Sequence, residues 1–195
     1  SNRDKVGQLK LLVNEIAFIE YLKCEGQKYS PFQVCGGAPG IHYELLSRMY
    51  PDIEFVLYDK MPFYAGLHKC ANIKLHNTYV TSSIARTEFD KTGVFVSDMR
   101  SLDMAEKKRE LSEKGKSDTY NYTIAKGMYD QLVFFLTSKC SNAMLKFKVP
   151  IGMSLSYPDG KLWIQPFINT NELRLVTTSM SDTIVYNGND IDSRC

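Results

Sequence analysis

The chain has 195 residues, which is the length of one domain. Hydrophobic residues make up 44% of it and charged residues 24%, a composition that excludes disordered, collagen-like and coiled-coil proteins. The formal net charge of +2 is too small for a protein that coats nucleic acid, so a polyanionic partner would have to bind in a local groove.

The five cysteines are widely spaced and form no C-x-x-C pair, which argues against a disulfide framework or a zinc knuckle and favours a reducing compartment. The longest apolar runs are about half of the roughly 20 residues that a membrane span needs, and the first residues lack the apolar stretch of a signal peptide. We therefore expect one soluble intracellular domain over residues 1–195 with no membrane partner. Because no initiator methionine is present, an excised or processed piece of a longer protein is also compatible with the sequence.

The first predicted element is a helix from Val6 to Tyr21. Its apolar residues recur at spacings of three and four, which is the pattern of one apolar helix face. Lys10 and Glu15 lie off this apolar stripe. The pattern therefore predicts an amphipathic helix.

A strand, a glycine-rich turn and a second helix follow, over Phe32–Cys35, Gly36–Gly40 and Ile41–Met49. A helical spacing over Tyr120–Leu136 predicts a crossover helix, and the polar stretch Asp103–Ser117 before it predicts a solvated loop or a frayed helix. Further runs are typical of strands: Ile53–Tyr58, Ile73–Leu75, Val94–Ser97, Ala143–Val149, Leu162–Gln165, Leu173–Thr178 and Thr183–Tyr186. Strands that alternate with helices predict an α/β fold with a doubly wound, mostly parallel central sheet and helices on both faces.

In such a sheet, ligands bind beyond the carboxyl ends of the strands, at the switch point. The glycine loop Gly36–Gly40 lets backbone approach a ligand, Asp59 follows the next strand where it could hold a ribose hydroxyl, and Asp98 follows a later strand. A nucleoside cofactor fits this pattern, although a purely structural glycine turn is the alternative. Pro39 removes one N–H donor and the spacing departs from G-x-G-x-x-G, which favours S-adenosylmethionine over NAD.

Five motifs occur in order along nearly the whole chain: Val6-Gly7-Gln8-Leu9-Lys10-Leu11-Leu12, Gly36-Gly37-Ala38-Pro39-Gly40-Ile41-His42, Val96-Ser97-Asp98-Met99-Arg100-Ser101, Leu145-Lys146-Phe147-Lys148, and Gln165-Pro166-Phe167 with Asn171-Glu172-Leu173-Arg174-Leu175. In order and spacing they resemble the poxvirus cap-specific mRNA (nucleoside-2′-O)-methyltransferase family, also known as the poly(A) polymerase regulatory subunit. The resemblance implies a Rossmann-like methyltransferase domain that uses S-adenosyl-L-methionine. It also implies methylation of the ribose 2′-hydroxyl of the first transcribed nucleotide of capped mRNA.

The resemblance carries over two sets of residues. The implied catalytic residues are Lys10, Asp98, Lys146 and Glu172, and the implied cofactor contacts are Gln8, Gly36, Gly40, Asp59, Asp98 and Arg100.

The catalytic set makes chemical sense, because a ribose hydroxyl is a poor nucleophile that needs a base, and a lysine can serve as that base. Lys146 is the candidate. A second ammonium at Lys10 would favour its neutral form, whereas Asp98 and Glu172 would favour its charged form. The plain alternative is that both lysines are ordinary solvated side chains.

The sequence departs from the family where the cap base is held. After Lys146 the chain runs Val149-Pro150-Ile151-Gly152-Met153, without the family's aromatic and acidic residues. Stacking of the base would then fall to Phe147, Tyr157, Trp163 or a flanking domain.

Phosphates of the RNA would bind basic side chains around the site. The candidates for that groove are Arg100, Lys107, Lys108, Arg109, Lys114, Lys116, Lys146, Lys148 and Arg174, although the run from Lys107 to Lys116 also reads as a solvated helix face. No metal is predicted, because His42, His68 and His76 show no metal-ligand spacing.

The implied partners are the capped RNA 5′ end and other viral capping, polymerase or poly(A) polymerase subunits, in the cytoplasm of an infected cell or in the virion. Two alternatives stay open. One is a 2′-O-ribose methyltransferase of ribosomal or transfer RNA, and the other is a non-catalytic RNA-binding subunit that stimulates a polymerase.

Overall fold

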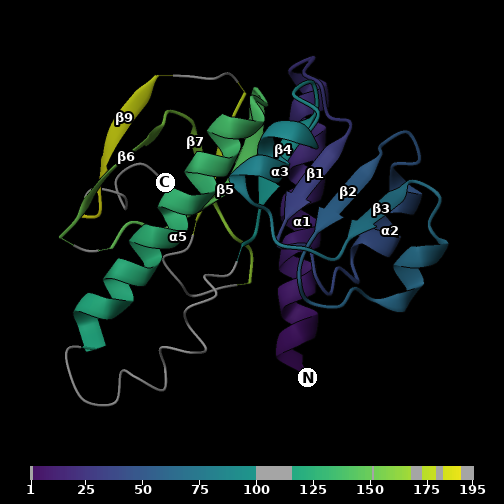
Figure 1. Ribbon diagram of the computed structural model, residues 1–195, viewed down its shortest axis with the longest axis horizontal. Helices are drawn as coiled ribbons and strands as arrows, with labels where there is room; N and C mark the ends of the chain where they lie inside the picture. Colours follow the sequence, from purple (N-terminus) through teal and green to yellow (C-terminus); the bar gives the residue numbers. More distant parts are fainter. Residues whose placement is uncertain (1, 100–115, 151, 168–172, 179–181, 190–195) are drawn as a thin grey trace.

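The computed structural model describes residues 2–99, 116–150, 152–167, 173–178 and 182–189. They form an α/β domain with a seven-stranded sheet and a separate two-stranded sheet (Figure 1). The helices are α1 (Asn2–Cys24), α2 (Tyr43–Met49), η1 (Ala65–Lys69, a 3₁₀ helix), α3 (Ser82–Thr87) and α5 (Lys116–Ser138). The strands are β1 (Phe32–Cys35), β2 (Phe55–Tyr58), β3 (Ile73–His76), β4 (Val94–Ser97), β5 (Asn142–Phe147), β6 (Ser154–Pro158), β7 (Lys161–Ile164), β8 (Leu173–Thr177) and β9 (Thr183–Asn187).

The large sheet has the strand order β3-β2-β1-β4-β5-β8-β7. Strands β1 to β5 pair in parallel, and β8 runs antiparallel to both of its neighbours, β5 and β7. The chain order reverses direction between β1 and β4, which makes that place the switch point. This is the Rossmann-like methyltransferase fold that the sequence predicts.

Every residue of the central strands β1, β2 and β4 is buried, which shows that both faces of the sheet are covered. Alternate residues of β1 show the division: Phe32 and Val34 pack in one core with side chains of α1, α2 and η1, whereas Cys35 packs in a second core with side chains of α5. Helices α3 and α5 contact each other on that second side (Figure 1). The small sheet of β6 and β9 adds Tyr157 and Tyr186 to the second core.

The structure extends several predicted elements and adds three. Helix α1 is longer than predicted at both ends, and α5 begins at Lys116, inside the stretch predicted as a solvated loop or frayed helix. Helix α3, η1 and strand β6 are absent from the sequence prediction. They are short elements, and α3 is held by a cap, since the Thr81 side chain accepts a hydrogen bond from the Ile84 N–H at 3.2 Å.

Within the described part of the chain, none of the helices combines the length and the apolar character that a membrane span requires.

Candidate functional site

The glycine loop after β1 lies directly against the backbone that follows β4. Gly36 has φ +85°, and a Cβ there would lie 2.8 Å from the carbonyl carbon of Asp98. Gly40 has φ +70°, and a Cβ there would lie 2.7 Å from the Gly37 carbonyl oxygen. Both positions therefore require glycine, for conformation and for space. The loop brings the ends of β1 and β4 together at the switch point.

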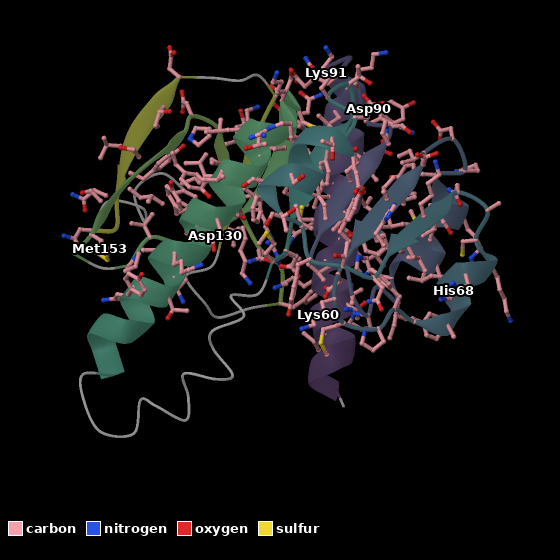
Figure 2. All side chains as sticks on the ribbon, in the orientation of Figure 1. Lys60, His68, Asp90, Lys91, Asp130 and Met153 are labelled. Atoms are coloured by element: carbon pink, nitrogen blue, oxygen red, sulfur yellow. The ribbon has the colours of Figure 1, made fainter. Side chains whose placement is uncertain are left out.

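Asp59 ends β2 at the same edge of the sheet and fixes the glycine loop. Its Oδ2 accepts a hydrogen bond from the Ala38 N–H at 3.0 Å, and its Oδ1 accepts one from the Met61 N–H at 2.8 Å. Lys60, the next residue, marks this edge in Figure 2, and Asp90 and Lys91, shortly before β4, mark the opposite edge. The carboxylate is only half-buried, so it combines a structural role with access from outside.

Asp98 follows β4 and faces cationic side chains. Its carboxylate accepts a hydrogen bond from Arg174 Nη2 at 2.7 Å and lies 4.0 Å from Lys146 Nζ. Burial raises the pKa of this carboxyl, but the charges of Arg174 and Lys146, with a smaller share from Lys10, outweigh burial and hold the pKa below its usual value. Asp98 is therefore an anion that organises the cations around it.

Lys146 and Arg174 are directly opposite each other on the antiparallel strands β5 and β8. Their neighbours along each strand, such as Leu145 and Leu175, belong to the second core. Because successive side chains of a strand point to opposite faces, Lys146 and Arg174 project from the other face of the sheet, which α1 covers. The Lys146 side chain is 30% exposed and Arg174 is 1% exposed. The lysine can therefore reach a substrate, whereas the arginine is part of the interior.

The N-terminal half of α1 supplies Gln8 and Lys10. Both residues are half-buried, and Lys10 is close enough to lower the pKa of Asp98. The helix is held in this place by Asn14, whose amide donates a buried hydrogen bond of 3.2 Å to Gln165, just after β7. Figure 1 shows the N-terminal end of α1 at the end of the molecule where Figure 2 labels Lys60.

The structure thus gathers three of the four predicted catalytic residues, Lys10, Asp98 and Lys146, at one edge of the sheet. Glu172 and Arg100, predicted as a catalytic residue and a cofactor contact, lie outside the described residues. So do Lys107, Lys108, Arg109 and Lys114 of the predicted RNA groove.

The prediction that Arg174 binds RNA phosphates is wrong. The guanidinium is buried, with Nη2 on Asp98 and Nη1 donating to the Ser97 carbonyl at 3.2 Å. An arginine between two leucines of a strand is compatible with a buried side chain as well as with an exposed one, and a buried arginine needs a carboxylate partner. This pattern could have indicated that Arg174 pairs with Asp98.

The prediction that Phe147 or Tyr157 stacks on the cap base is also wrong. Phe147 and Tyr157 are fully buried, and they pack against each other with ring centroids 5.8 Å apart. Trp163 is half-buried on β7, where it packs edge-on against Phe18 and Tyr21 and lines a cavity of about 430 Å³.

Glu15 is a residue whose importance the sequence analysis missed. Glu15 lies off the apolar stripe of the first helix, but only 2% of it is exposed, and its carboxylate contacts His42 and Tyr43. The reason is that α2 covers this side of α1, so a polar position there is buried.

Among the described residues, no cluster of His, Cys, Asp and Glu could hold a metal ion.

Two solved structures of WbdD are similar to this chain. One, a co-crystal structure with the kinase inhibitor LY294002, is 11% identical with a TM-score of 0.41, and the other, a high-resolution structure, is 9% identical with a TM-score of 0.40. Each comparison covers 88% of this chain, which spans 40% of the WbdD chain.

No curated protein matches this sequence. The family model of the poly A polymerase regulatory subunit, in contrast, matches residues 2–191, which is nearly the whole chain. The chain therefore belongs to the poly A polymerase regulatory subunit family.

Proposed function

We propose that this chain transfers a methyl group from S-adenosyl-L-methionine to the ribose 2′-hydroxyl of the first transcribed nucleotide of capped mRNA. The observation that carries the proposal is the position of Lys146 Nζ, 4.0 Å from the Asp98 carboxylate at the switch point of a methyltransferase-like fold. The family assignment supports the same reading.

The residues present fit the cofactor. Gly36 and Gly40 lie in a loop where a Cβ would collide with neighbouring backbone, so this loop presents main chain rather than side chains to a ligand. Asp59 uses its carboxylate oxygens to accept two backbone N–H groups, and the remaining lone pairs of this half-buried group suit a ribose hydroxyl. The Gln8 amide contacts His42, two residues after Gly40, and so lies beside the end of the loop.

The chemistry divides between the cofactor and the chain. When bound, S-adenosyl-L-methionine supplies a methyl group whose bond to sulfur breaks as its bond to the ribose oxygen forms. Lys146 takes the proton of the 2′-hydroxyl, and Asp98 orients Lys146. Arg174 fixes Asp98 from the interior side. Holding the reacting groups in line contributes roughly 7–11 kcal/mol in favourable cases.

The test measures transfer of a labelled methyl group to short capped and uncapped RNAs, with the product nucleoside identified. We expect a 2′-O-methylated first nucleotide on capped RNA, and a loss of transfer of at least about a hundredfold in Lys146→Ala with cofactor binding retained. Lys91→Ala, an exposed lysine at the opposite edge of the sheet, is the matched control and should keep full activity. Equal activity of Lys146→Ala and wild type would remove Lys146 from the mechanism. Methylation of uncapped ribosomal or transfer RNA alone would support the alternative substrate.

The family description favours a second function, association with poly(A) polymerase. We propose that this role does not use the methyl-transfer chemistry. Lys146→Ala should therefore still lengthen the tails made by poly(A) polymerase from the same source. If this variant lost both activities while remaining folded, the two functions would share the site.

A further inference from the structure

A chain of buried polar side chains links α1 to the start of α2. Glu15 and His42 each expose only 3% of their side chains, and Glu15 Oε2 lies 2.6 Å from His42 Nε2. The hydroxyl of Tyr43 donates to the other carboxylate oxygen, Oε1, at 2.5 Å. Neither residue of the Glu15–His42 pair has a part in the methyl transfer proposed above, yet a buried charged pair is costly unless it is well compensated.

The direction of the hydrogen bonds in this chain can be worked out. Burial raises the pKa of the Tyr43 hydroxyl well above its usual value, and the charge of Glu15 adds to the effect, so the hydroxyl keeps its proton and donates. An ionised carboxylate only accepts. His42 must then donate to Glu15 from Nε2.

The other side of His42 contacts Gln8. Gln8 Oε1 lies 3.0 Å from His42 Nδ1 and accepts a second, longer hydrogen bond of 3.4 Å from the backbone N–H of His42. Because a backbone N–H can only donate, it selects the oxygen end of the amide. With the oxygen in this place, Nδ1 must carry a hydrogen as well.

The opposite end of the amide is available to a ligand. The Gln8 side chain is half-buried, and among the described residues its NH₂ group has no hydrogen-bond partner. His42 comes two residues after Gly40, so this donor stands at the end of the glycine loop. The complement of an NH₂ donor is an acceptor, and the anionic acceptor of S-adenosyl-L-methionine is its carboxylate.

We propose that Glu15 and His42 are positioning residues: they hold the Gln8 amide by its oxygen so that its NH₂ group binds the carboxylate of the cofactor. The inference rests on the proposed function, because it assumes this cofactor, and it adds two residues that act through a third.

The experiment compares two ligands by calorimetry: S-adenosylhomocysteine, which has the carboxylate, and methylthioadenosine, which lacks the whole amino-acid end of the cofactor, including that carboxylate. We expect Glu15→Gln and Gln8→Ala each to lower the affinity for S-adenosylhomocysteine by about tenfold, which is the order of one hydrogen bond to a charged group. The affinity for methylthioadenosine should be unchanged. The double variant should bind no more weakly than Gln8→Ala, since Glu15 acts through Gln8. If the role of Glu15 were purely structural, Glu15→Gln would lower the affinity for both ligands equally, and this result would overturn the inference.

Glu20→Gln is the matched control on the same helix. Its carboxylate accepts a hydrogen bond of 2.8 Å from the Tyr50 hydroxyl and belongs to a separate contact, so both ligands should bind as they do to the wild type. Loss of S-adenosylhomocysteine affinity in Glu20→Gln equal to that in Glu15→Gln would also overturn the inference.

A second measurement uses the wild-type chain and so does not depend on the folding of Glu15→Gln. Nitrogen-15 NMR of the His42 ring should show hydrogen on both nitrogens, and a ring protonated at Nε2 alone would contradict the proposal. If the wild type binds S-adenosylhomocysteine but Glu15→Gln binds it equally well, only this inference fails. If the wild type binds neither ligand, the proposed function fails and this inference fails with it.

Discussion

Asp59 and Asp98 are the same residue type in equivalent places, since each directly follows a parallel strand at the carboxyl edge of one sheet. Their partners differ in kind. The carboxylate of Asp59 accepts hydrogen bonds from two backbone N–H groups, whereas that of Asp98 faces the guanidinium of Arg174 and the ammonium of Lys146.

The difference follows from what lies beside each strand. β2 ends next to the glycine loop, which offers main-chain donors, and β4 ends next to β5, whose neighbour β8 contributes a buried arginine. Asp59 therefore fixes the shape of a loop, and Asp98 compensates a buried charge. Position on the sheet determines which of these two roles a carboxylate takes.

The largest expected effect comes from removing the buried cation. Arg174→Met leaves Asp98 without its closest partner, and breaking a buried pair in this way costs about 3–5 kcal/mol of the free energy of unfolding. Urea denaturation measures the loss. Arg174→Lys keeps the charge and should be less destabilised. If the two variants were equally stable, the charge of Arg174 would have no part in the pairing.

Asp59→Asn should have a smaller effect. Asparagine has one acceptor oxygen, so one of the two backbone N–H groups loses its partner, at a cost of about 1 kcal/mol in the free energy of unfolding. The same denaturation measurement applies. Asp130→Asn, which breaks an exposed pair with Lys126 on α5, is the control and should cost less than about 0.5 kcal/mol. Equal losses in the two variants would mean that Asp59 does not hold the loop.

The smallest effect is confined to acid pH. The folded-state pKa of Asp98 is depressed, so its contribution to stability is present above the unfolded pKa of about 3.9 and is lost as pH falls through the folded value. The difference in unfolding free energy between wild type and Asp98→Asn should therefore narrow below about pH 4. Urea titrations over this range measure it. A difference that stays constant with pH would contradict the assignment of the depressed pKa to Asp98.

The central strands could be predicted from the sequence because their physics is local. Phe32–Cys35 and Val94–Ser97 are predicted with the bounds that the structure gives, since each is a short, mostly apolar run that is buried on both faces. Strand β6 could not be predicted in this way, because among the described strands it pairs with β9 alone and its exposed positions, Ser154 and Ser156, are polar.

The candidate site could be predicted only in part. The order of the motifs predicts that Asp98 and Lys146 belong to one site, and the structure brings them to 4.0 Å. The burial of Arg174 and Glu15 was not predicted, because charged residues are expected to be solvated when only the sequence is known. Whether a charge is buried depends on which element covers it, α1 for Arg174 and α2 for Glu15, and that is decided by tertiary packing.

The hydrogen bond between Asn14 and Gln165 joins residues that are 151 positions apart in the chain. Since synthesis proceeds from the N-terminus, α1 leaves the ribosome long before the strands that it must join. Contacts of such long range slow folding, because the intervening chain must be ordered before they form. A nascent chain that stops before β8 thus has the glycine loop, Lys10 and Lys146 but lacks Arg174, the nearer of the two cations that pair with Asp98, and the site is completed late in folding.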